Sequence, residues 1–138
     1  MIIKKAELKD CKACLELSKI PELLNPDGTP SHLWWIESFV NENQIFYVAE
    51  ERGEIIGFTM GERTTGNIAI RHSTFVKPEF RGKGIGSKLI EQFEAECKRR
   101  KLKAIMSYGY AKNNKTIKFF EGKGYIKGAL TYEFIKFL

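Results

Sequence analysis

The chain lacks any long run of hydrophobic residues, and it has little cysteine, histidine and proline. Among its 138 residues are three cysteines, two histidines and four prolines. No window approaches the ~18 consecutive apolar residues that a membrane helix requires. No apolar stretch follows the amino-terminal lysines as it does in a secretory signal. We therefore expect a cytoplasmic protein without a membrane partner.

The small number of cysteines excludes a disulfide-stabilised scaffold. Three cysteines in a chain without a secretory signal indicate free thiols in a reducing compartment. Cys11 and Cys14 form a C-x-x-C, but no second ligand pair accompanies them and both fall in a predicted helix. A buried helical pair is therefore favoured over a metal or redox site, and we expect no metal cofactor.

Internal repeats, low-complexity tracts and linkers are also absent. A hydrophobic content of 43% and a charged content of 29% are typical of one globular domain, so residues 1–138 are predicted to form a single domain. The net charge of +6 suits an anionic ligand, nucleic acid or a solvated basic surface. No block of like charge exceeds the four residues 98–101, which also suit a helix end.

What the sequence does contain is a basic, glycine-rich stretch in its second half. Gly82, Gly84 and Gly86 occupy three of five positions, beside Arg81 and Lys83. Glycine lets backbone N–H groups turn toward one point, and the first N–H groups of a helix are unpaired and lie at its positive end. The stretch predicts a seat for a phosphate or pyrophosphate, with a solvent-exposed basic turn as the alternative.

The residues that follow predict an amphipathic helix. Ile85, Leu89, Phe93 and Cys97 recur at four-residue spacing, which places them on one face. The glycine spacing is G-x-G-x-G, which matches neither the G-x-G-x-x-G of dinucleotide folds nor a Walker loop. The anion is therefore not identified by these two motifs.

Hydrophobic periodicity and turn residues predict the order β-α-α-β-β-β-α-β-α-β-β. Strands are expected at 1–5, 45–50, 54–63, 67–76, 103–110, 124–127 and 130–137, and helices at 8–19, 29–40, 85–101 and 113–122. Hairpins combined with one strand-helix-strand crossover indicate an α/β (α+β) fold. We expect a mixed, mostly antiparallel sheet of about seven strands with helices on both faces.

Two segments resemble motifs of the GCN5-related N-acetyltransferase (GNAT) family. Residues 81–86, RGKGIG, match the acetyl-CoA signature R/Q-x-x-G-x-G/A. Residues 113–125, NNKTIKFFEGKGY, are similar to the family pattern N-x-x-A-x-x-[LF]-Y-E-x-x-G-F. The resemblance implies the acyl-CoA N-acyltransferase (GNAT) fold. It also implies an acetyl-CoA-dependent N-acetyltransferase, in which a primary amine of a small molecule or protein attacks acetyl-CoA directly in a ternary complex.

The resemblance also implies a cofactor site. Pyrophosphate would bind the backbone of the glycine stretch, and pantetheine would pair with the preceding strand, where a backbone N–H would polarise the thioester carbonyl. Asn113 is either a contact to the pantetheine arm or only a helix N-cap. The residues implied at CoA are Phe75, Val76, Arg81, Gly82, Lys83, Gly84, Ile85, Gly86, Ser87, Asn113, Lys115 and Phe120.

The catalytic residues depart from the family pattern at two positions. Many members carry a Glu where this chain has His72, which as an imidazole can take a proton near neutral pH or simply hydrogen-bond a neighbour. The usual general acid is a Tyr where this chain has Phe120. Tyr110 or Tyr108 is a candidate replacement, or the thiolate leaves unassisted, since thiols ionise near pH ~8.5.

The acceptor amine is not identified by the sequence. Trp34 and Trp35 lie about 100° apart on one helix, so either one of them reaches a pocket or surface groove, or a long loop buries a helix that is apolar over a wide face. An acyl-CoA-binding module with little turnover is the alternative function. A basic nucleic-acid-binding domain ranks third, because the basic residues do not alternate with the aromatic residues on which the bases of a single strand would stack. The oligomeric state stays open, with a homodimer as one option.

Overall fold

A computed structural model describes the whole sequence, from Met1 to Leu138, and a five-stranded sheet forms its centre. The strands are β1 (Ile2–Lys5), β2 (Gln44–Glu51), β3 (Glu54–Thr64), β4 (Ile68–Val76) and β5 (Ala104–Ser107). They lie in the sheet in chain order. Neighbours are antiparallel except β4 and β5, which run parallel and therefore need a crossover connection.

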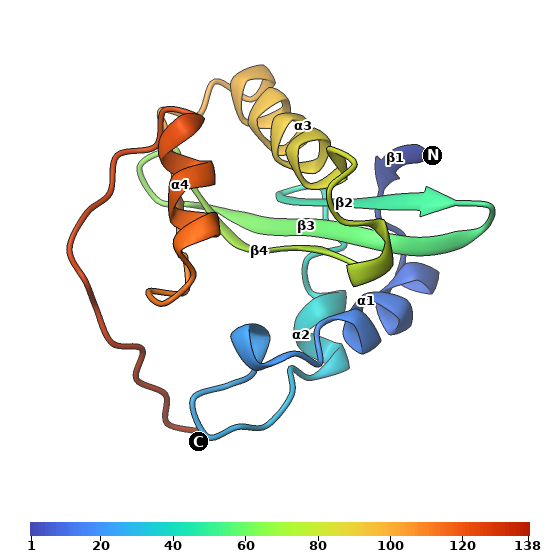
Figure 1. Cartoon of the computed structure of the whole chain (residues 1–138), viewed down its shortest axis with the longest axis horizontal. Coiled ribbons are helices and arrows are strands. Elements are labelled where there is room, and N and C mark those ends of the chain that lie inside the picture. Colours follow the sequence, from blue (N-terminus) through green and yellow to red (C-terminus); the bar gives the residue numbers. More distant parts are fainter.

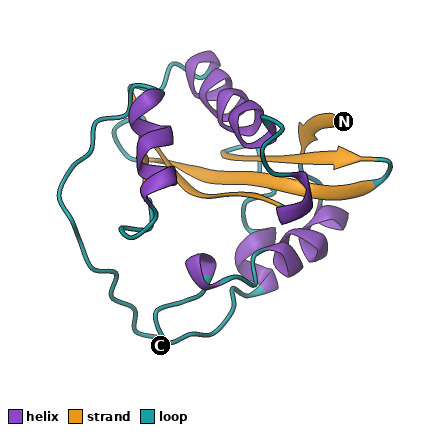
Figure 2. Ribbon diagram, viewed as in Figure 1, coloured by secondary structure: helices purple, strands orange, loops and turns teal.

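Helices cover both faces of the sheet (Figure 1). The helices are α1 (Cys11–Leu17), α2 (Leu33–Glu37), α3 (Ile85–Arg99) and α4 (Asn114–Gly122), with short 3-10 turns η1 (Leu8–Asp10), η2 (Pro21–Leu23) and η3 (Pro78–Phe80). Figure 2 shows α1 and α2 on one face and α3 and α4 on the other. The crossover from β4 to β5 runs through α3.

The middle strands are apolar on both faces because both faces are covered. On β2, Phe46 and Val48 pack in the core on the α1 and α2 side, whereas Ile45, Tyr47 and Ala49 pack in the core on the α3 side. Alternate side chains of a strand point to opposite faces, so one apolar run supplies two cores. The apolar stripe of α3 fills the second core, as its four-residue spacing predicts.

Strand β4 contains one residue more than the facing part of β3. Met60 pairs with Ser73 and Gly61 pairs with Arg71, so His72 has no partner on β3. An extra residue of this kind is a β-bulge, which redirects the side chains around it. Arg71 points toward the layer of α3 and α4, whereas His72 points toward α2.

The predicted fold class is confirmed, but the sheet has five strands rather than about seven. Residues 124–127 and 130–137 form no strand. Figure 1 shows this last segment leaving α4 and passing along the outside of the molecule. Several of its large side chains are exposed, Phe134 to 91%. The alternating pattern there is that of a strand, but a strand also needs an edge with which to pair, and this segment pairs with none.

Smaller differences concern where elements end. Strand β5 stops at Ser107 because its pairing with β4 stops there, at Arg71, so the prediction to residue 110 was too long. Helix α2 ends at Glu37, after which Phe39 and Val40 continue as tighter i to i+3 turns. No helix of the chain combines the length and hydrophobicity that crossing a membrane requires.

Candidate active site

The turn between β4 and α3 depends on two glycines in the left-handed backbone region. Gly82 has φ of 77° and Gly84, the N-cap of α3, has φ of 79°. Residues with a Cβ rarely adopt this conformation. No atom lies within 4 Å of where a Cβ at either glycine would stand, so the outer side of the loop is open to a ligand.

Six consecutive backbone N–H groups of this loop, from Gly82 to Ser87, have no hydrogen-bond acceptor. The first internal bond at this end of α3 is from the N–H of Lys88 to the carbonyl of Gly84, at 3.1 Å. Unpaired N–H groups at the positive end of a helix attract anions. The structure thus provides the donors that the sequence predicted for a phosphate seat.

The basic side chains of the loop have different surroundings. Arg81 turns back onto the strand, where its Nε donates to the carbonyl of Val76 at 2.8 Å and its guanidinium lies 5.1 Å from the ring centre of Phe75. Lys83 is exposed, with its Nζ 5.5 Å from the ring centre of Phe80. Arg81 therefore secures the end of β4, and Lys83 remains available to solvent anions.

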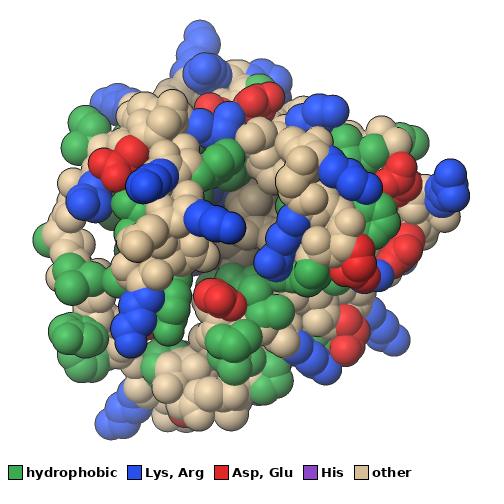
Figure 3. Space-filling view, viewed as in Figure 1, with side chains coloured by type: hydrophobic (Ala, Val, Ile, Leu, Met, Phe, Trp, Pro, Cys, Tyr) green, Lys and Arg blue, Asp and Glu red, His purple; other side chains and the backbone are tan.

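A groove of about 490 Å³ extends from the loop between α3 and α4. Figure 3 shows a hollow in this face with Lys and Arg side chains around it. The lining residues are Thr74, Val76, Phe80, Arg81, Gly82, Gly84, Ile85, Gly86, Ser87, Ile90, Lys115, Thr116, Phe119 and Phe120. The groove lining therefore contains nine of the twelve residues that the sequence assigned to the cofactor.

The backbone of β4 beside this groove has an unpaired edge. The N–H of Lys77 donates to Ile56 of β3 at 2.8 Å, and hydrogen-bonded pairs alternate along an antiparallel ladder. The N–H groups of Thr74 and Val76 therefore point away from β3. Because β5 pairs with β4 only as far as Arg71, these two N–H groups face no strand.

The three remaining predicted cofactor residues lie outside the groove lining. The side chain of Phe75 is only 6% exposed, in the core on the α1 and α2 side, so only its backbone is near the groove. Asn113 caps α4, because its Oδ1 accepts the N–H of Thr116 at 3.1 Å. Lys83 is exposed beside Phe80 and does not line the groove. Val76 and Lys115, by contrast, line the groove directly.

His72 lies on the opposite face of β4, in an aromatic and acidic environment. Its Nε2 is 3.1 Å from Oε2 of Glu62 on β3. Its ring centre is 5.5 Å from those of Trp35 and Phe39. Glu62 was not identified from the sequence. The β3–β4 hairpin places Glu62 near His72, but the two side chains meet because of the β-bulge. No residue pattern in the sequence indicates that bulge.

The two tryptophans divide as their spacing predicted. Trp35 is half-buried and packs against Phe39 at 4.9 Å between ring centres, beside His72. Trp34 is 66% exposed and stacks on His32 at 5.7 Å. One aromatic face of α2 thus orients His72, and the other is open to solvent.

The position of Phe120 was the largest departure from the resemblance, and no nearby tyrosine replaces it from β5. Tyr108 and Tyr110 are 62% and 53% exposed, and neither lines the groove. The tyrosine beside Phe120 is instead Tyr125, at 5.3 Å between ring centres. Tyr125 was quoted in the second motif, but only the fold brings its hydroxyl to β4.

The hydroxyl of Tyr125 links a buried arginine to an acid. It accepts a hydrogen bond from Nη1 of Arg71 at 3.0 Å and donates to Glu94 at 2.8 Å. Burial raises the pKa of the Tyr125 hydroxyl. The sequence shows Arg71 only as one more basic residue on a strand, and nothing in its spacing indicates that it is buried.

The three cysteines are unsuited to act as nucleophiles. All are buried and free. Burial raises the pKa of the Cys11 and Cys97 thiols to about 11 and also raises that of Cys14. Because the thiolate is the reactive form, these side chains are inert at neutral pH, and the buried helical pair favoured from the sequence is the arrangement observed.

Comparison with known proteins adds family information to this geometry. Residues 42–127 match the family model described as acetyltransferase (GNAT) domain. An uncharacterised N-acetyltransferase of Methanocaldococcus jannaschii is 36% identical over 94 residues, covering 68% of this chain. That match covers 57% of the relative, so the chain corresponds to little more than half of its length.

Solved structures share the fold at low sequence identity. The aminoglycoside N-acetyltransferase AAC(6')-Iy in complex with CoA superposes with a TM-score of 0.77 at 16% identity, covering 99% of this chain and 100% of that chain. The ribosomal-protein-S18-alanine N-acetyltransferase from Escherichia coli gives a TM-score of 0.79 at 18% identity, with 93% and 79% covered. The sheet and its helices are therefore those of the GNAT fold.

Proposed function

The chain belongs to the acetyltransferase (GNAT) family, and on that premise we propose that it transfers the acetyl group of acetyl-CoA to a primary amine. The observation that carries the proposal is the continuity of the groove. Six unpaired N–H groups at the glycine loop lead, along one groove, to the unpaired edge of β4. An anionic head joined to an extended, amide-containing arm matches this arrangement, and CoA has both parts.

In this proposal the loop holds the pyrophosphate of CoA. The N–H groups from Gly82 to Ser87 supply hydrogen bonds to the phosphate oxygens, with Lys83 and Lys115 adding positive charge. The pantetheine arm then pairs with the N–H groups of Thr74 and Val76, as an added strand would. A backbone N–H of the same edge polarises the thioester carbonyl.

The amine approaches from the other face of β4, where His72 and Glu62 lie. An ammonium has no free electron pair, so it must lose a proton before it attacks. The imidazole of His72 accepts that proton directly or through water, and Glu62 stabilises the resulting imidazolium. The C–N bond forms as the C–S bond breaks, and the electron pair of the C–S bond goes to sulfur.

A specific observation favours a second candidate, an acyl-CoA-binding module with little turnover. Phe120 has no hydroxyl, and Tyr108 and Tyr110 lie outside the groove. A module of this kind would bind acetyl-CoA and release no thiol with any amine. The acceptor itself, small molecule or protein, is left open by this proposal.

We also propose that residues 1–138 act as one domain. Support comes from the two cores, which lie on opposite faces of the same sheet and share β2, β3 and β4 as their common wall. A chain divided in two would be expected to show a break in such shared packing.

The test is a thiol-release assay with acetyl-CoA and a panel of amines, which includes polyamines, aminoglycosides and peptides with free amino termini. We expect release that depends on both the enzyme and an amine. Binding of CoA without release across the whole panel would favour the binding module. Absence of CoA binding would contradict both candidates.

A further inference from the structure

Arg71 is a buried cation without a counter-ion. The residue is 1% exposed on β4, and its Nη2 has no hydrogen-bond partner. Its Nη1 donates to the neutral hydroxyl of Tyr125 at 3.0 Å. No carboxylate pairs with it directly; the acid in its network, Glu94, is reached only through Tyr125. Burying a charge without a partner is costly, so the position calls for a functional explanation.

Aromatic rings surround the guanidinium. Its central carbon lies 4.8 Å from the ring centre of Phe120, 5.2 Å from Tyr125 and 5.6 Å from Phe93. Ring faces attract a cation and so offset part of the cost of burial. The rings leave the donor capacity of Nη2 unused, however, because they accept no strong hydrogen bond.

The titratable groups around Arg71 are few. Glu94 and Cys97 face it from α3, and Tyr125 faces it from the segment that follows α4. Its partner on β5 is Ser107. The pKa of the Cys97 thiol is about 11 because of burial, so this thiol carries no charge at neutral pH. Glu94 is therefore the one acidic group near the positive charge of Arg71, and it is connected to Arg71 only through the hydroxyl of Tyr125.

Arg71 lies beyond the end of the groove that is away from the glycine loop. Phe120, which covers its guanidinium, lines the groove, and so does Thr74, three residues further along β4. The pairing of β4 with β5 ends at Arg71 itself. A cofactor whose pyrophosphate sits at the loop, and whose arm follows β4, carries its sulfur toward this point.

We propose that Arg71 stabilises the thiolate of CoA as it leaves, a role that rests on the proposed acetyl transfer. The amine forms the C–N bond, the C–S bond breaks, and its electron pair stays on sulfur as a thiolate. Arg71 keeps its own proton, because a guanidinium does not deprotonate in proteins, and acts by charge and by its free Nη2 donor. The thiolate takes a proton from solvent after release. The charge of Arg71 thus compensates for the hydroxyl that Phe120 lacks.

The test compares CoA with acetyl-CoA, because the two differ in the thiol and share every other ionisable group. Their dissociation constants are measured by calorimetry with the unmodified protein from pH 6 to 9. A thiolate stabilised in the complex makes the affinity for CoA relative to acetyl-CoA rise with pH, about tenfold for each unit by which the thiol pKa falls below its free value near 8.5. A ratio that stays constant with pH would overturn the proposal.

The variants Arg71→Met and Arg71→Lys assign the effect to this side chain. In Arg71→Met the new side chain fills a similar volume without charge. This variant should bind acetyl-CoA, but its affinity for CoA relative to acetyl-CoA should not change with pH. Arg71→Lys should retain part of the rise, and it provides the test if the Met variant does not fold. A rise that is undiminished in either folded variant would overturn the role of Arg71. Failure of the unmodified protein to bind either ligand would instead overturn the proposed function from which this role follows.

Discussion

At the level of single residues, the proposed transfer depends most on His72 and its neighbours. The bulge in β4 turns His72 toward Trp35 and Phe39, and Glu62 lies 3.1 Å from its Nε2. Rings on one side and a carboxylate on the other hold the imidazole in one orientation. The proposed base is therefore already oriented before it accepts a proton.

We predict that His72→Ala lowers turnover with a saturating amine by about 10²-fold, the lower end of what a general base contributes. The affinity for acetyl-CoA should change little, because the groove lies on the other face of β4. Turnover and acetyl-CoA affinity are measured separately between pH 6 and 9. Unchanged turnover across that range would remove His72 from the mechanism.

Glu62→Gln is the matched control for this prediction. It keeps a hydrogen-bond acceptor near Nε2 but removes the negative charge that stabilises an imidazolium. We expect a smaller loss of turnover than in His72→Ala, because the imidazole remains to accept the proton but its protonated form is no longer stabilised by a carboxylate. A larger loss than in His72→Ala would mean that the carboxylate itself is the base.

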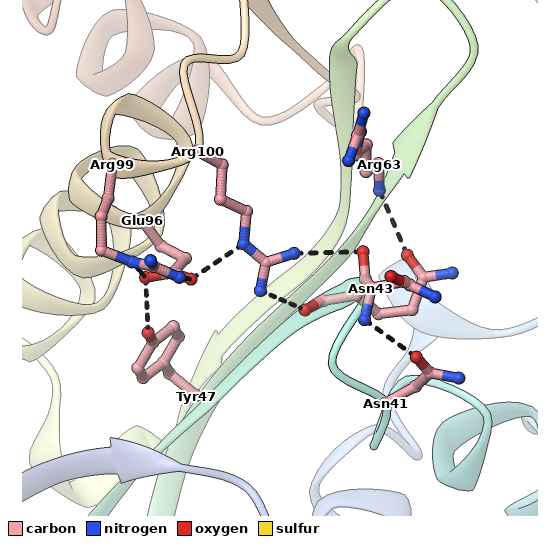
Figure 4. A network of polar contacts seen from close by, with 8 residues as sticks. Asn41, Asn43, Tyr47, Arg63, Glu96, Arg99 and Arg100 are labelled. Atoms are coloured by element: carbon pink, nitrogen blue, oxygen red, sulfur yellow. Dashed lines mark hydrogen bonds and ion pairs between the residues drawn. The ribbon is translucent and has the colours of Figure 1, made fainter.

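Glu96 illustrates a residue whose role is structural. Its carboxylate accepts hydrogen bonds from Arg99 at 2.6 Å and Arg100 at 2.8 Å and contacts Tyr47 at 3.3 Å (Figure 4). Arg100 continues to the carbonyls of Asn43 and Gln44 at 3.1 and 3.0 Å. The network joins the end of α3 to the start of β2, and the hydrogen bonds from Arg99, with those of Arg100, lower the pKa of Glu96 to about 2.

A lowered carboxyl pKa stabilises the fold at pH values above the unfolded value, near 4.5, and this contribution is lost as the pH falls toward 2. Glu96→Gln should therefore lower the melting temperature at pH 7, by an amount that corresponds to no more than about 3 kcal/mol. The difference from the unmodified protein should shrink on acidification, as Glu96 itself becomes neutral. Melting curves from pH 7 to 2.5 check this, and a difference independent of pH would contradict it.

At the level of secondary-structure elements, the loop between β4 and α3 is the proposed binding site for the CoA pyrophosphate. We predict that Gly84→Asp lowers CoA affinity by about tenfold or more, because two charges of like sign ~4 Å apart repel by roughly 1 to 4 kcal/mol between bulk water and a protein surface. Calorimetry with CoA measures the loss. Unchanged affinity would mean that the loop does not bind the cofactor.

Gly66→Asp controls for the backbone strain of this substitution. Gly66 lies in the turn between β3 and β4, has φ of 82° and likewise has no atom within 4 Å of an added Cβ. Both variants should lose similar stability. Only the Gly84 variant should lose affinity for CoA, since Gly66 is outside the groove.

The N-terminus of α4 distinguishes the two interpretations of Asn113. Asn113→Ala should lower the free energy of unfolding by about 1 kcal/mol, the usual cost of a lost N-cap, as measured by denaturant titration. Asn113→Asp keeps the cap, so its stability should be close to that of the unmodified protein. CoA affinity that falls in the Asp variant would identify Asn113 as a cofactor contact as well, whereas equal affinity would leave it a cap alone. Full stability in Asn113→Ala would contradict the cap.

The sequence predicted the local elements well and the long-range contacts poorly. Strands β1 to β4, the glycine loop and α3 follow from periodicity and turn residues, which act over a few positions. The contact between Arg71 and Tyr125 spans 54 residues and depends on how α4 packs. The pairing of Glu62 with His72 depends on a bulge. The prediction of strands at 124–127 and 130–137 was wrong. An alternating pattern of apolar and polar residues indicates which side chains share a face, but it does not show that a neighbouring strand is available for pairing.

At the level of the whole molecule, strand β4 separates the groove proposed to bind the cofactor from the residues proposed to activate the amine. The groove, the glycine loop and Arg71 lie on the side of α3 and α4, and His72, Glu62 and Trp35 lie on the side of α2. The bulge in β4 sends adjacent side chains to these opposite sides. In the proposed reaction, acetyl-CoA and the amine therefore approach from opposite faces of the sheet and do not compete for one pocket.

The measurement that tests this account most directly is a thermal-shift titration with acetyl-CoA, CoA and ATP. A ligand that binds only the folded state at 100 times its dissociation constant adds about 2.7 kcal/mol of stability, which raises the melting temperature of a domain of this size by several degrees. We predict such a rise with acetyl-CoA and CoA and little with ATP, which has phosphates but no pantetheine arm. No rise with either CoA species would contradict the central claim that the loop and groove bind acetyl-CoA.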